Sequence, residues 1–315
     1  MASICILDEF EVHKNEKFLA IAEQLKPELY KKEIKPVSLL TLETKGHPEP
    51  VIVDSEPIEE LSRKQLKRNE SVILDFGNHH VGYVTLDLAS AGSHQDAPAY
   101  IFLKFAERLD ELAADSNQYD GWLSRSWIQE EHIHVDVLPA KLELTRRYAF
   151  RYLEIKVIDV SPKYSLVINN VTGTSVSAVE KEEIQPVSAK EPILQEIDKV
   201  SIRTLRNCMQ LVFEDGPKRD RRMWLGDLRL QARANYKTFH NTDLVKRCLY
   251  LFGGLTFNEG KVPACLFLEP ELEPDDTYLF DYALLYGSVL LDYYEETKDR
   301  ETLEDLYPVA IRQIE

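Results

Sequence analysis

The spacing of apolar residues divides the chain into two parts with different periods. Up to about residue 185, short runs rich in β-branched and aromatic residues alternate with polar residues, as half-buried strands do. The runs cover residues 72–76, 81–88, 99–105, 132–138 and 151–158. Within one of them, Ile133, Val135 and Val137 share a face, while His134 and Asp136 share the other. Regularly spaced short strands predict an antiparallel β-sandwich of the jelly-roll type.

From about residue 190 the apolar period becomes helical. Apolar side chains recur three and four residues apart, which predicts amphipathic helices. These helical runs cover residues 192–213, 243–252, 282–294 and 301–314. Asp299 is placed to cap the start of the last helix. The charged, proline-containing segment 177–192 is typical of a linker. We therefore expect a β-sandwich domain over residues 1–180 and a helical domain over residues 181–315.

Composition places the chain among ordinary globular proteins. Its 315 residues are 44% hydrophobic and 29% charged, and this length favours two domains. The net charge of −16 argues against nucleic-acid partners, whose phosphates attract basic surfaces. The sequence has neither a secretory signal pattern nor a membrane-spanning apolar run. We expect a cytoplasmic protein that binds no nucleic acid and no membrane, with a homodimer as one possible assembly.

Cysteine and histidine spacing gives no sign of a metal or cofactor. The four cysteines, Cys5, Cys208, Cys248 and Cys265, lack the paired spacing of metal sites or disulfide frameworks, so reduced thiols are expected. His132 and His134 share a strand face, but no third ligand follows at a suitable spacing. His79 and His80 follow a glycine and are expected in a hairpin. We expect neither a metal nor a cofactor.

The segment 214–227, EDGPKRDRRMWLGD, carries the densest candidate chemistry. Asp215, Asp220 and Asp227 lie among four basic residues, with a Gly-Pro break and Trp224 between them. One helical run ends before the segment and another begins at its end, so the acids lie in a helix–loop–helix connection. Such connections often hold binding and catalytic groups.

The segment has both a structural and a chemical interpretation. In the structural one, Asp227 caps a helix, Asp215 pairs with Arg219, and Trp224 fills the core. In the chemical one, the set cleaves a glycosidic bond, which requires one protonated carboxyl and a second carboxylate. Further carboxylates and arginines bind sugar hydroxyls, and an indole stacks on the sugar ring. Capping and ion pairing do not need three acids in one connection, so the chemical interpretation accounts better for the whole set.

The motif DGPKRDRRMWLGD resembles the signature of the bacterial α-L-rhamnosidases of glycoside hydrolase family 78. That signature runs Asp-x-Pro-x-x-acid and then Trp-x-Gly-Asp, at the opening of an (α/α)6 barrel. Residues 146–155 resemble the last strands of the family's β-sandwich, and residues 278–299 resemble a later helix pair of the barrel. The resemblance implies an N-terminal β-sandwich followed by the first part of a six-hairpin glycosidase barrel.

The resemblance also implies roles for individual residues. Asp215 and Asp227 match the aspartates that hold rhamnose hydroxyls, and Asp220 matches the general acid of one branch of the family. Trp224 matches an aromatic residue that lines the barrel. Arg219 is expected either to bind a hydroxyl or to hold Asp215.

One further residue matches the family, and two positions differ from its signature. Asp281 matches a position near the sugar pocket, although a helix start would explain it equally well. The family acid is usually Glu, so Asp220 is one methylene shorter, and Arg221 replaces a residue that is acidic in another branch. Glu269, Glu271 and Glu273 (EPELEP) are expected in a solvated loop.

The family's general base is a Glu far downstream. A twelve-helix toroid needs roughly 200 residues or more, and fewer than that follow residue 190. We therefore expect a truncated chain whose base lies beyond residue 315, and little or no activity from the chain alone. The implied function is inverting hydrolysis of terminal α-L-rhamnose from glycosides. The alternative is a non-catalytic carbohydrate-binding or assembly module, in which the sandwich binds sugar and the helices form an interface.

Overall fold

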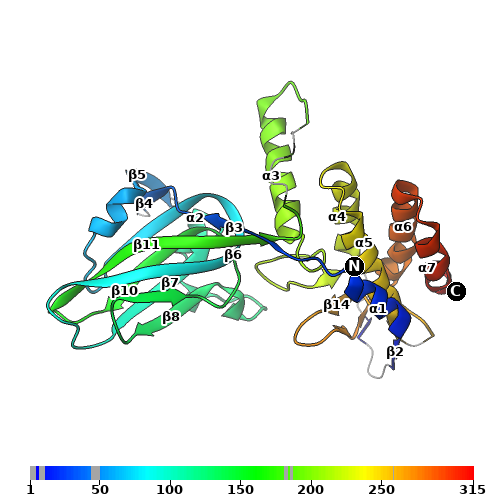
Figure 1. Ribbon diagram of the computed structural model, residues 1–315, viewed down its shortest axis with the longest axis horizontal. Coiled ribbons are helices and arrows are strands. Elements are labelled where there is room, and N and C mark those ends of the chain that lie inside the picture. Colours follow the sequence, from blue (N-terminus) through cyan, green and yellow to red (C-terminus); the bar gives the residue numbers. More distant parts are fainter. Residues whose placement is uncertain (1–4, 7–10, 44–49, 181–183, 185–186, 258) are drawn as a thin grey trace. The chain divides into compact units, whose positions relative to one another are not determined.

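The chain forms two compact units, one built from strands and one mainly from helices (Figure 1). The computed structural model describes residues 5–6, 11–43, 50–180, 184, 187–257 and 259–315. The β unit comprises Lys31–Val176, and the helical unit comprises the described residues of Met1–Tyr30 and of Ser177–Glu315. The predicted mixture of β and α structure is confirmed.

The β unit is built on one large antiparallel sheet. Its main path follows the order β3-β11-β6-β10-β7-β8, while β4 and β9 also pair with β6, and β5 pairs with β4. The nine strands are β3 (Tyr30–Ile34), β4 (Ser38–Glu43), β5 (Val51–Pro57), β6 (Ser71–Gly92), β7 (Ala99–Ala106), β8 (Glu130–Val135), β9 (Ala140–Glu143), β10 (Tyr148–Asp159) and β11 (Tyr164–Ser177).

Strand β6 joins two parts of this sheet. Its first half pairs with β10 and its second half pairs with β11, and Gly82 has a partner on both strands. A Cβ at Gly82 would lie 1.9 Å from the carbonyl oxygen of Thr174, so only glycine fits there. The hairpin expected at His79–His80 is wrong, because β6 continues through both residues. The local irregularity is instead a shift in register against β10, next to Gly77 with its φ of +76°.

The strand faces that turn inward form the core of the β unit. Ile101, Leu103, Leu153 and Ile155 are fully buried there, and the residues between them, Phe102 and Glu154, are only partly buried. A helix, α2 (Leu109–Ala113), covers part of the outer face and packs there against Ala106 and Tyr152. Three short 3-10 turns complete the unit: η1 (Ile58–Arg63), η2 (Ser116–Gln118) and η3 (Arg125–Trp127).

The helical unit confirms the predicted helical runs, including the one that begins at the end of segment 214–227, except that the first run ends at Cys208 and not at residue 213. Helix α4 packs on α6, and α6 packs on α7. The helices are α1 (Glu16–Gln24), α3 (Pro192–Cys208), α4 (Leu225–Lys237), α5 (Thr242–Gly254), α6 (Phe280–Thr297) and α7 (Arg300–Arg312). Short strands join them: β1 (Cys5–Ile6), β2 (Val12–Lys14), β12 (Met223–Trp224), β13 (Leu255–Phe257), β14 (Cys265–Phe267), β15 (Glu273–Pro274) and β16 (Thr277–Tyr278).

The described residues before Tyr30 belong to the helical unit, which differs from the expected sandwich domain over residues 1–180. Helix α1 packs on α5, where the Phe18 ring meets Tyr250 edge to face at 5.5 Å. The buried guanidinium of Arg247 donates to the carbonyl oxygens of Ala22 and Leu211. The apolar face of α1 therefore finds its partner more than 200 residues later, a pairing that periodicity alone does not specify.

Three further features are a helix cap, the cysteine thiols and the apolar character of the helices. The predicted cap at Asp299 is confirmed, since its carboxylate accepts a hydrogen bond from the backbone N–H of Thr302. The thiols of Cys208, Cys248 and Cys265 are buried. No helix in the described part of the chain is both long and apolar enough to cross a membrane.

Candidate functional site

The acidic segment forms the connection between α3 and α4. Helix α3 ends at Cys208, so residues 209–213, expected to be helical, instead form a turn closed by a bridge between Met209 and Phe213. Two hydrogen bonds, one between backbone groups and one to a side chain, then close the loop that follows. The N–H of Asp215 donates to the carbonyl of Arg222 at 2.9 Å, and the N–H of Arg222 donates to the Asp215 carboxylate at 3.1 Å. Asp215 is thereby fixed at the base of this loop.

Asp220 lies within the loop in an uncommon backbone conformation. Asp220 and Arg221 have φ values of +61° and +58°, in the left-handed region that non-glycine residues rarely occupy. The Arg221 side chain supports this turn by donating from Nε to the carbonyl of Pro217 at 2.9 Å. Two consecutive left-handed residues cost free energy, and such strain is concentrated at functional sites.

Arg219 pairs with the neighbouring acid and not with Asp215. Its guanidinium lies 2.7 Å from the Asp220 carboxylate. The Asp220 side chain is 18% exposed and that of Arg219 is 44% exposed. The ion pair therefore lies at the surface of the loop with the acid on its more buried side.

The three aspartates form one electrostatic cluster. Burial, together with the negative charges of Asp220 and Asp227, raises the pKa of Asp215 to about 6. The backbone N–H groups of Arg222 and Gly216 oppose this rise. Burial also raises the pKa of Asp227. Like charges held together in a partly desolvated place favour the protonated form of at least one carboxyl.

Tyr282 lies over the start of α4 and joins this cluster. A Cβ on Gly226 would lie 2.4 Å from the Tyr282 ring, so the ring rests directly on the backbone there. The Trp224 ring meets Tyr282 edge to face, with centroids 6.3 Å apart. Burial raises the pKa of Tyr282, as do the charges of Asp227, Asp281 and Asp215. Trp224 and Tyr282 thus form the aromatic side of the acidic cluster.

Asp281 belongs to the edge of the same region. It lies in the first turn of α6 and is exposed, but its charge reaches Tyr282. A carboxylate in the first turn of a helix also suits the helix dipole, so the helix-start interpretation accounts for its position, and a role near the sugar pocket stays a prediction.

A small sheet supports the segment from the other side. Met223 and Trp224 pair with Leu266 and Cys265, and the guanidinium of Arg222 lies 4.0 Å from the centre of the Phe267 ring. The contact between Arg222 and Phe267 was not predicted from the sequence. Their contact joins residues 45 positions apart, and no local motif marks it.

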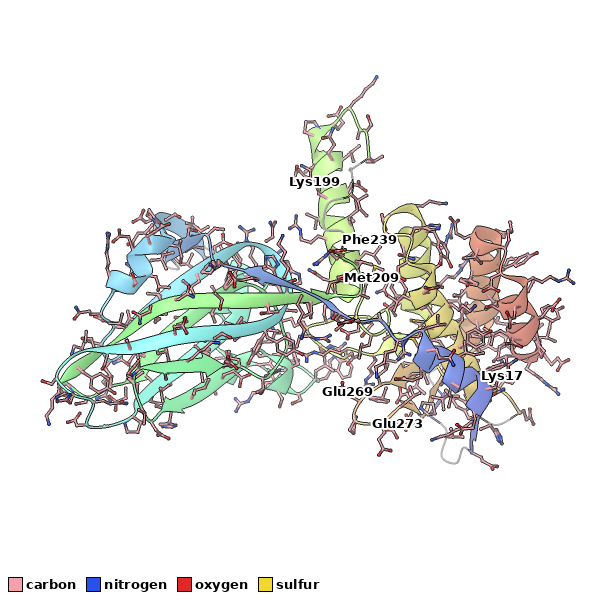
Figure 2. All side chains as sticks on the ribbon, in the orientation of Figure 1. Lys17, Lys199, Met209, Phe239, Glu269 and Glu273 are labelled. Carbon is pink, nitrogen blue, oxygen red and sulfur yellow. The ribbon has the colours of Figure 1, made fainter. Side chains whose placement is uncertain are left out.

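The three acids of the EPELEP segment lie on an exposed stretch, with Glu269 and Glu271 in the connection before β15 and Glu273 at the start of β15. Glu269, Glu271 and Glu273 are all exposed, as predicted, and Figure 2 shows Glu269 and Glu273 on the outside of the helical unit. Among the described residues, no group of three or more His, Cys, Asp or Glu side chains is arranged to hold a metal ion.

The chemistry available to the cluster follows from these contacts. One carboxyl holds a proton up to about pH 6, two others lie close enough to act on it, and two aromatic rings adjoin them. Carboxylates bind neutral polyols through paired hydrogen bonds to hydroxyl groups, and a protonated carboxyl is the group that a glycosidic leaving oxygen requires.

Comparison with family models gives two adjacent matches. Residues 48–175 match the N-terminal domain of glycosyl hydrolase family 78 alpha-rhamnosidases. Residues 182–315 match the six-hairpin glycosidase domain of bacterial alpha-L-rhamnosidases. The second match contains all the residues of the candidate site, from Asp215 to Tyr282.

The chain is also similar to solved structures of rhamnosidases. A rhamnosidase from Klebsiella oxytoca with rhamnose bound is 42% identical with a TM-score of 0.93, over 96% of this chain and 59% of that chain. A family 78 rhamnosidase from a Bacillus species (18% identity, TM-score 0.61, 78% of this chain and 24% of that chain covered) and an α-L-rhamnosidase from Aspergillus terreus (16% identity, TM-score 0.57, 92% and 29% covered) share the fold. No curated protein sequence matches the chain.

Proposed function

The chain belongs to the α-L-rhamnosidases of glycosyl hydrolase family 78, and we propose that it supplies the sugar-binding and acid side of a site that hydrolyses terminal α-L-rhamnosides with inversion. The observation that supports this most is the acidic cluster of Asp215, Asp220 and Asp227 beside Trp224 and Tyr282. The substrate is a rhamnose-containing glycoside. In this proposal the helical unit is the first part of an (α/α)6 barrel, and the β unit is the sandwich that accompanies it.

Asp220 is the general acid in this proposal. Its carboxylate is paired with Arg219, so the pair must open before Asp220 donates a proton to the leaving oxygen. Arg219 is the more exposed partner and is free to turn toward a hydroxyl of the bound sugar. The left-handed backbone at Asp220 fixes where its short side chain projects, which matters because proton transfer depends on positions at the ångström scale.

Asp215 and Asp227 bind the hydroxyls of rhamnose, with Trp224 beside the sugar and Asp281 at the rim. Because burial raises the pKa of Asp215 to about 6, this side chain changes from donor to acceptor near neutral pH. The reaction also requires a second carboxylate to activate water on the opposite face of the sugar. The exposed acids of the EPELEP segment are poor candidates for it, and the 315 residues cover 59% of the Klebsiella protein. We assign the base to the part of the family's length that these residues do not span.

A test compares two proteins on a chromogenic α-L-rhamnoside. One is the 315-residue chain, and the other is a chimaera in which it is continued by the part of the Klebsiella protein that it does not cover. We expect turnover from the chimaera and little or none from the chain alone. A chimaera that folds but is inactive would contradict the proposed acid side, and full turnover by the chain alone would contradict the assignment of the base.

The proposal also includes a cellular compartment and an oligomeric state. We place it in the cytoplasm, since the buried thiols Cys208, Cys248 and Cys265 suit a reducing compartment. The possible homodimer stays a prediction.

A further inference from the structure

The outer face of the β unit carries a row of paired side chains that the proposed function does not use. Strands β7 and β8 align so that each outward residue of one strand faces an outward residue of the other. The aligned pairs are Lys104 with Glu130, Phe102 with His132, and Tyr100 with His134. On the other side of β7, strand β10 adds Glu154 opposite Lys104 and Lys156 opposite Phe102. The residues between them, such as Ile101 and Leu103, turn inward and are fully buried.

The middle of this face is aromatic. The Tyr100 ring stacks on His134, with centroids 4.1 Å apart and planes 4° from parallel. The Phe102 ring lies 4.9 Å from the His132 ring, and the Tyr100 hydroxyl lies 3.3 Å from Nδ1 of His132. Both histidines are exposed. Tyr100 and His134 cover one face of each other, and the four rings together form an aromatic patch that the apolar face of a sugar ring can contact.

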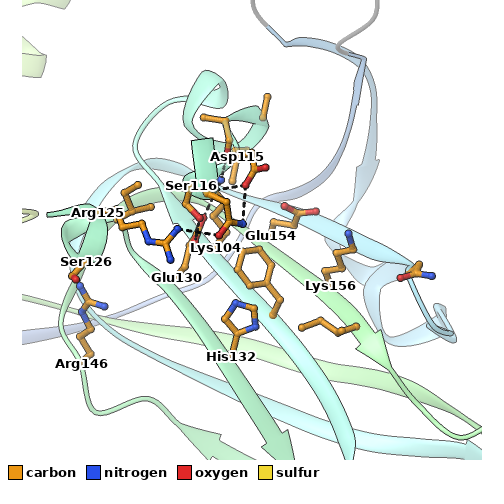
Figure 3. Close-up of a pocket in the computed structure, with 18 residues that line it drawn as sticks. Lys104, Asp115, Ser116, Arg125, Ser126, Glu130, His132, Arg146, Glu154 and Lys156 are labelled. Atoms are coloured by element: carbon orange, nitrogen blue, oxygen red, sulfur yellow. Dashed lines mark hydrogen bonds and ion pairs between the residues drawn. The ribbon is translucent and has the colours of Figure 1, made fainter. Parts of the chain in front are cut away.

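One end of the row is closed by the segment 109–127. Leu112 of α2 packs on the sheet, and the chain that follows is held by Lys104, whose ammonium donates to the carbonyl of Ala114 and lies 3.2 Å from Glu130. The hydroxyl of Ser116 donates to the same Glu130 carboxylate at 2.6 Å. Figure 3 shows this segment over the sheet, with Arg125 beside the Lys104–Glu130 pair. The segment 109–127 is therefore held on the sheet by partly buried polar contacts.

Two hollows lie along this face. One, of about 640 Å³, lies between the segment 109–127 and the sheet, and its lining includes Phe102 and His132. The other, of about 650 Å³, lies at the opposite end, and its lining includes Tyr100 and His134. Each volume is within the range of small-ligand sites. From Lys104 to Tyr100 the strand rises about 13 Å, which gives room for more than one sugar unit.

The charges of the first hollow are balanced. Four cations and three carboxylates line it, together with serine and asparagine side chains. The charged residues are Lys104, Arg125, Arg146, Lys156, Asp115, Glu130 and Glu154. Such a mixture offers no net attraction to a polyanion, and the chain as a whole carries a net charge of −16. Donors and acceptors in nearly equal number are suited to the hydroxyl groups of a neutral sugar.

We propose that the outer face of β7, β8 and β10 is a binding groove for a neutral oligosaccharide, made of residues distinct from the acidic cluster of the helical unit. Tyr100, Phe102, His132 and His134 stack against sugar rings. Lys156, Glu154 and Arg125 bind their hydroxyls at the end closed by the segment 109–127. The groove adds a sugar-binding surface to the β unit and does not depend on the assignment of the rhamnosidase acid or base.

The test is a calorimetric titration of the 315-residue chain with cellohexaose, xylohexaose and mannohexaose, and separately with L-rhamnose. We expect at least one hexasaccharide to bind. The double variant Tyr100→Ala/His134→Ala and the single variant Lys156→Ala should each weaken that binding about tenfold or more, equivalent to about 1.4 kcal/mol. Tyr83→Ala, at a tyrosine on β6 that is 40% exposed, is the matched control and should leave it unchanged.

The outcomes separate this groove from the acidic cluster. Asp215→Asn should leave hexasaccharide binding unchanged and weaken the binding of rhamnose. If none of the three hexasaccharides binds, the proposed groove is wrong. It is also wrong if Tyr100→Ala/His134→Ala and Lys156→Ala bind the hexasaccharide as tightly as wild type while keeping the wild-type melting temperature. Loss of hexasaccharide binding in Asp215→Asn would also overturn it, because the sugar would then occupy the acidic cluster. If Lys156→Ala alone folds normally, that variant decides the outcome.

Discussion

The Arg219 guanidinium lies 2.7 Å from the Asp220 carboxylate, one residue further along the same loop. The pair occupies a turn in which Asp220 and Arg221 both have left-handed backbone conformations. A candidate proton donor is thus paired with a cation. Release of this cation when the glycoside binds would couple sugar recognition to the readiness of the acid.

Replacement of Asp220 tests its role as acid. In the chimaera with the Klebsiella segment, Asp220→Asn should lower kcat by a factor of about 10² or more, since the amide has no proton to give. The matched control is Asp110→Asn, an exposed aspartate of α2 that also pairs with an arginine. The readout is steady-state turnover of a chromogenic rhamnoside. An unchanged kcat in Asp220→Asn would assign the acid to another residue.

Asp215 should make stability fall as pH rises. Burial raises the pKa of its carboxyl to about 6 in the folded chain, above the unfolded value near 3.9. Between about pH 4 and 6 the folded state therefore binds more protons than the unfolded state, and its stability decreases with pH. The variant Asp215→Asn lacks this loss, so its free energy of unfolding should gain about 1–3 kcal/mol relative to wild type between pH 4 and 7. Urea unfolding at several pH values measures this difference, and a constant difference would contradict the raised pKa.

Asp299 should have the opposite pH dependence. Burial acts to raise the pKa of its carboxyl, but the Lys246 ammonium and the N–H and hydroxyl of Thr302 outweigh it and hold the pKa below its usual range. The stabilisation is present above the unfolded pKa and is lost as pH falls below it. Asp299→Ala removes a helix cap and should cost about 1–2 kcal/mol at pH 7. At strongly acid pH the cost should shrink, and urea unfolding at pH 7 and pH 3 checks this.

The contact between Gly226 and Tyr282 gives a test of packing in the candidate site. A Cβ in Gly226→Ala would lie 2.4 Å from the Tyr282 ring. The ring must move, at a cost of about 1–3 kcal/mol. Gly287→Ala in α6 is the matched control, because its Cβ would lie 3.9 Å from Ala310 in ordinary contact, and it should be neutral or stabilising by up to about 1 kcal/mol.

The double variant Gly226→Ala/Tyr282→Ala should recover much of the loss, as measured by thermal unfolding. If Gly226→Ala alone proved as stable as wild type, Tyr282 would not be fixed over α4.

Sequence periodicity predicted most helices because their signals are local. The cap at Asp299 and the stripe that follows it lie within one segment, and the structure has a helix there. The same local signal misled at Met209–Phe213, where apolar residues continue the helical spacing but form a turn in the core. Strand β11 was missed, since Asn169, Asn170 and Gly173 interrupt its alternation and a register shift falls beside them.

The candidate site was likewise predicted only in part: residues close together in the sequence were found, and contacts between distant segments were not. Asp215, Asp220, Trp224 and Asp227 were found together because they are contiguous in sequence. The Arg222–Phe267 contact was out of reach, since it depends on the pairing of β12 with β14. The pairing of Arg219 with Asp220 depends on a turn conformation that the residue types alone do not specify.

The docking of α1 on α5 has a consequence for the order of events on the ribosome. The chain begins the helical unit, leaves it at Tyr30, completes the whole β unit, and returns at Ser177. At a synthesis rate of about 5–20 residues per second, α1 waits for roughly ten seconds or more before α5 emerges. The inserted β unit can fold first, as a unit made without interruption. During that delay the exposed Phe18 face of α1 is a place where a holding chaperone would bind.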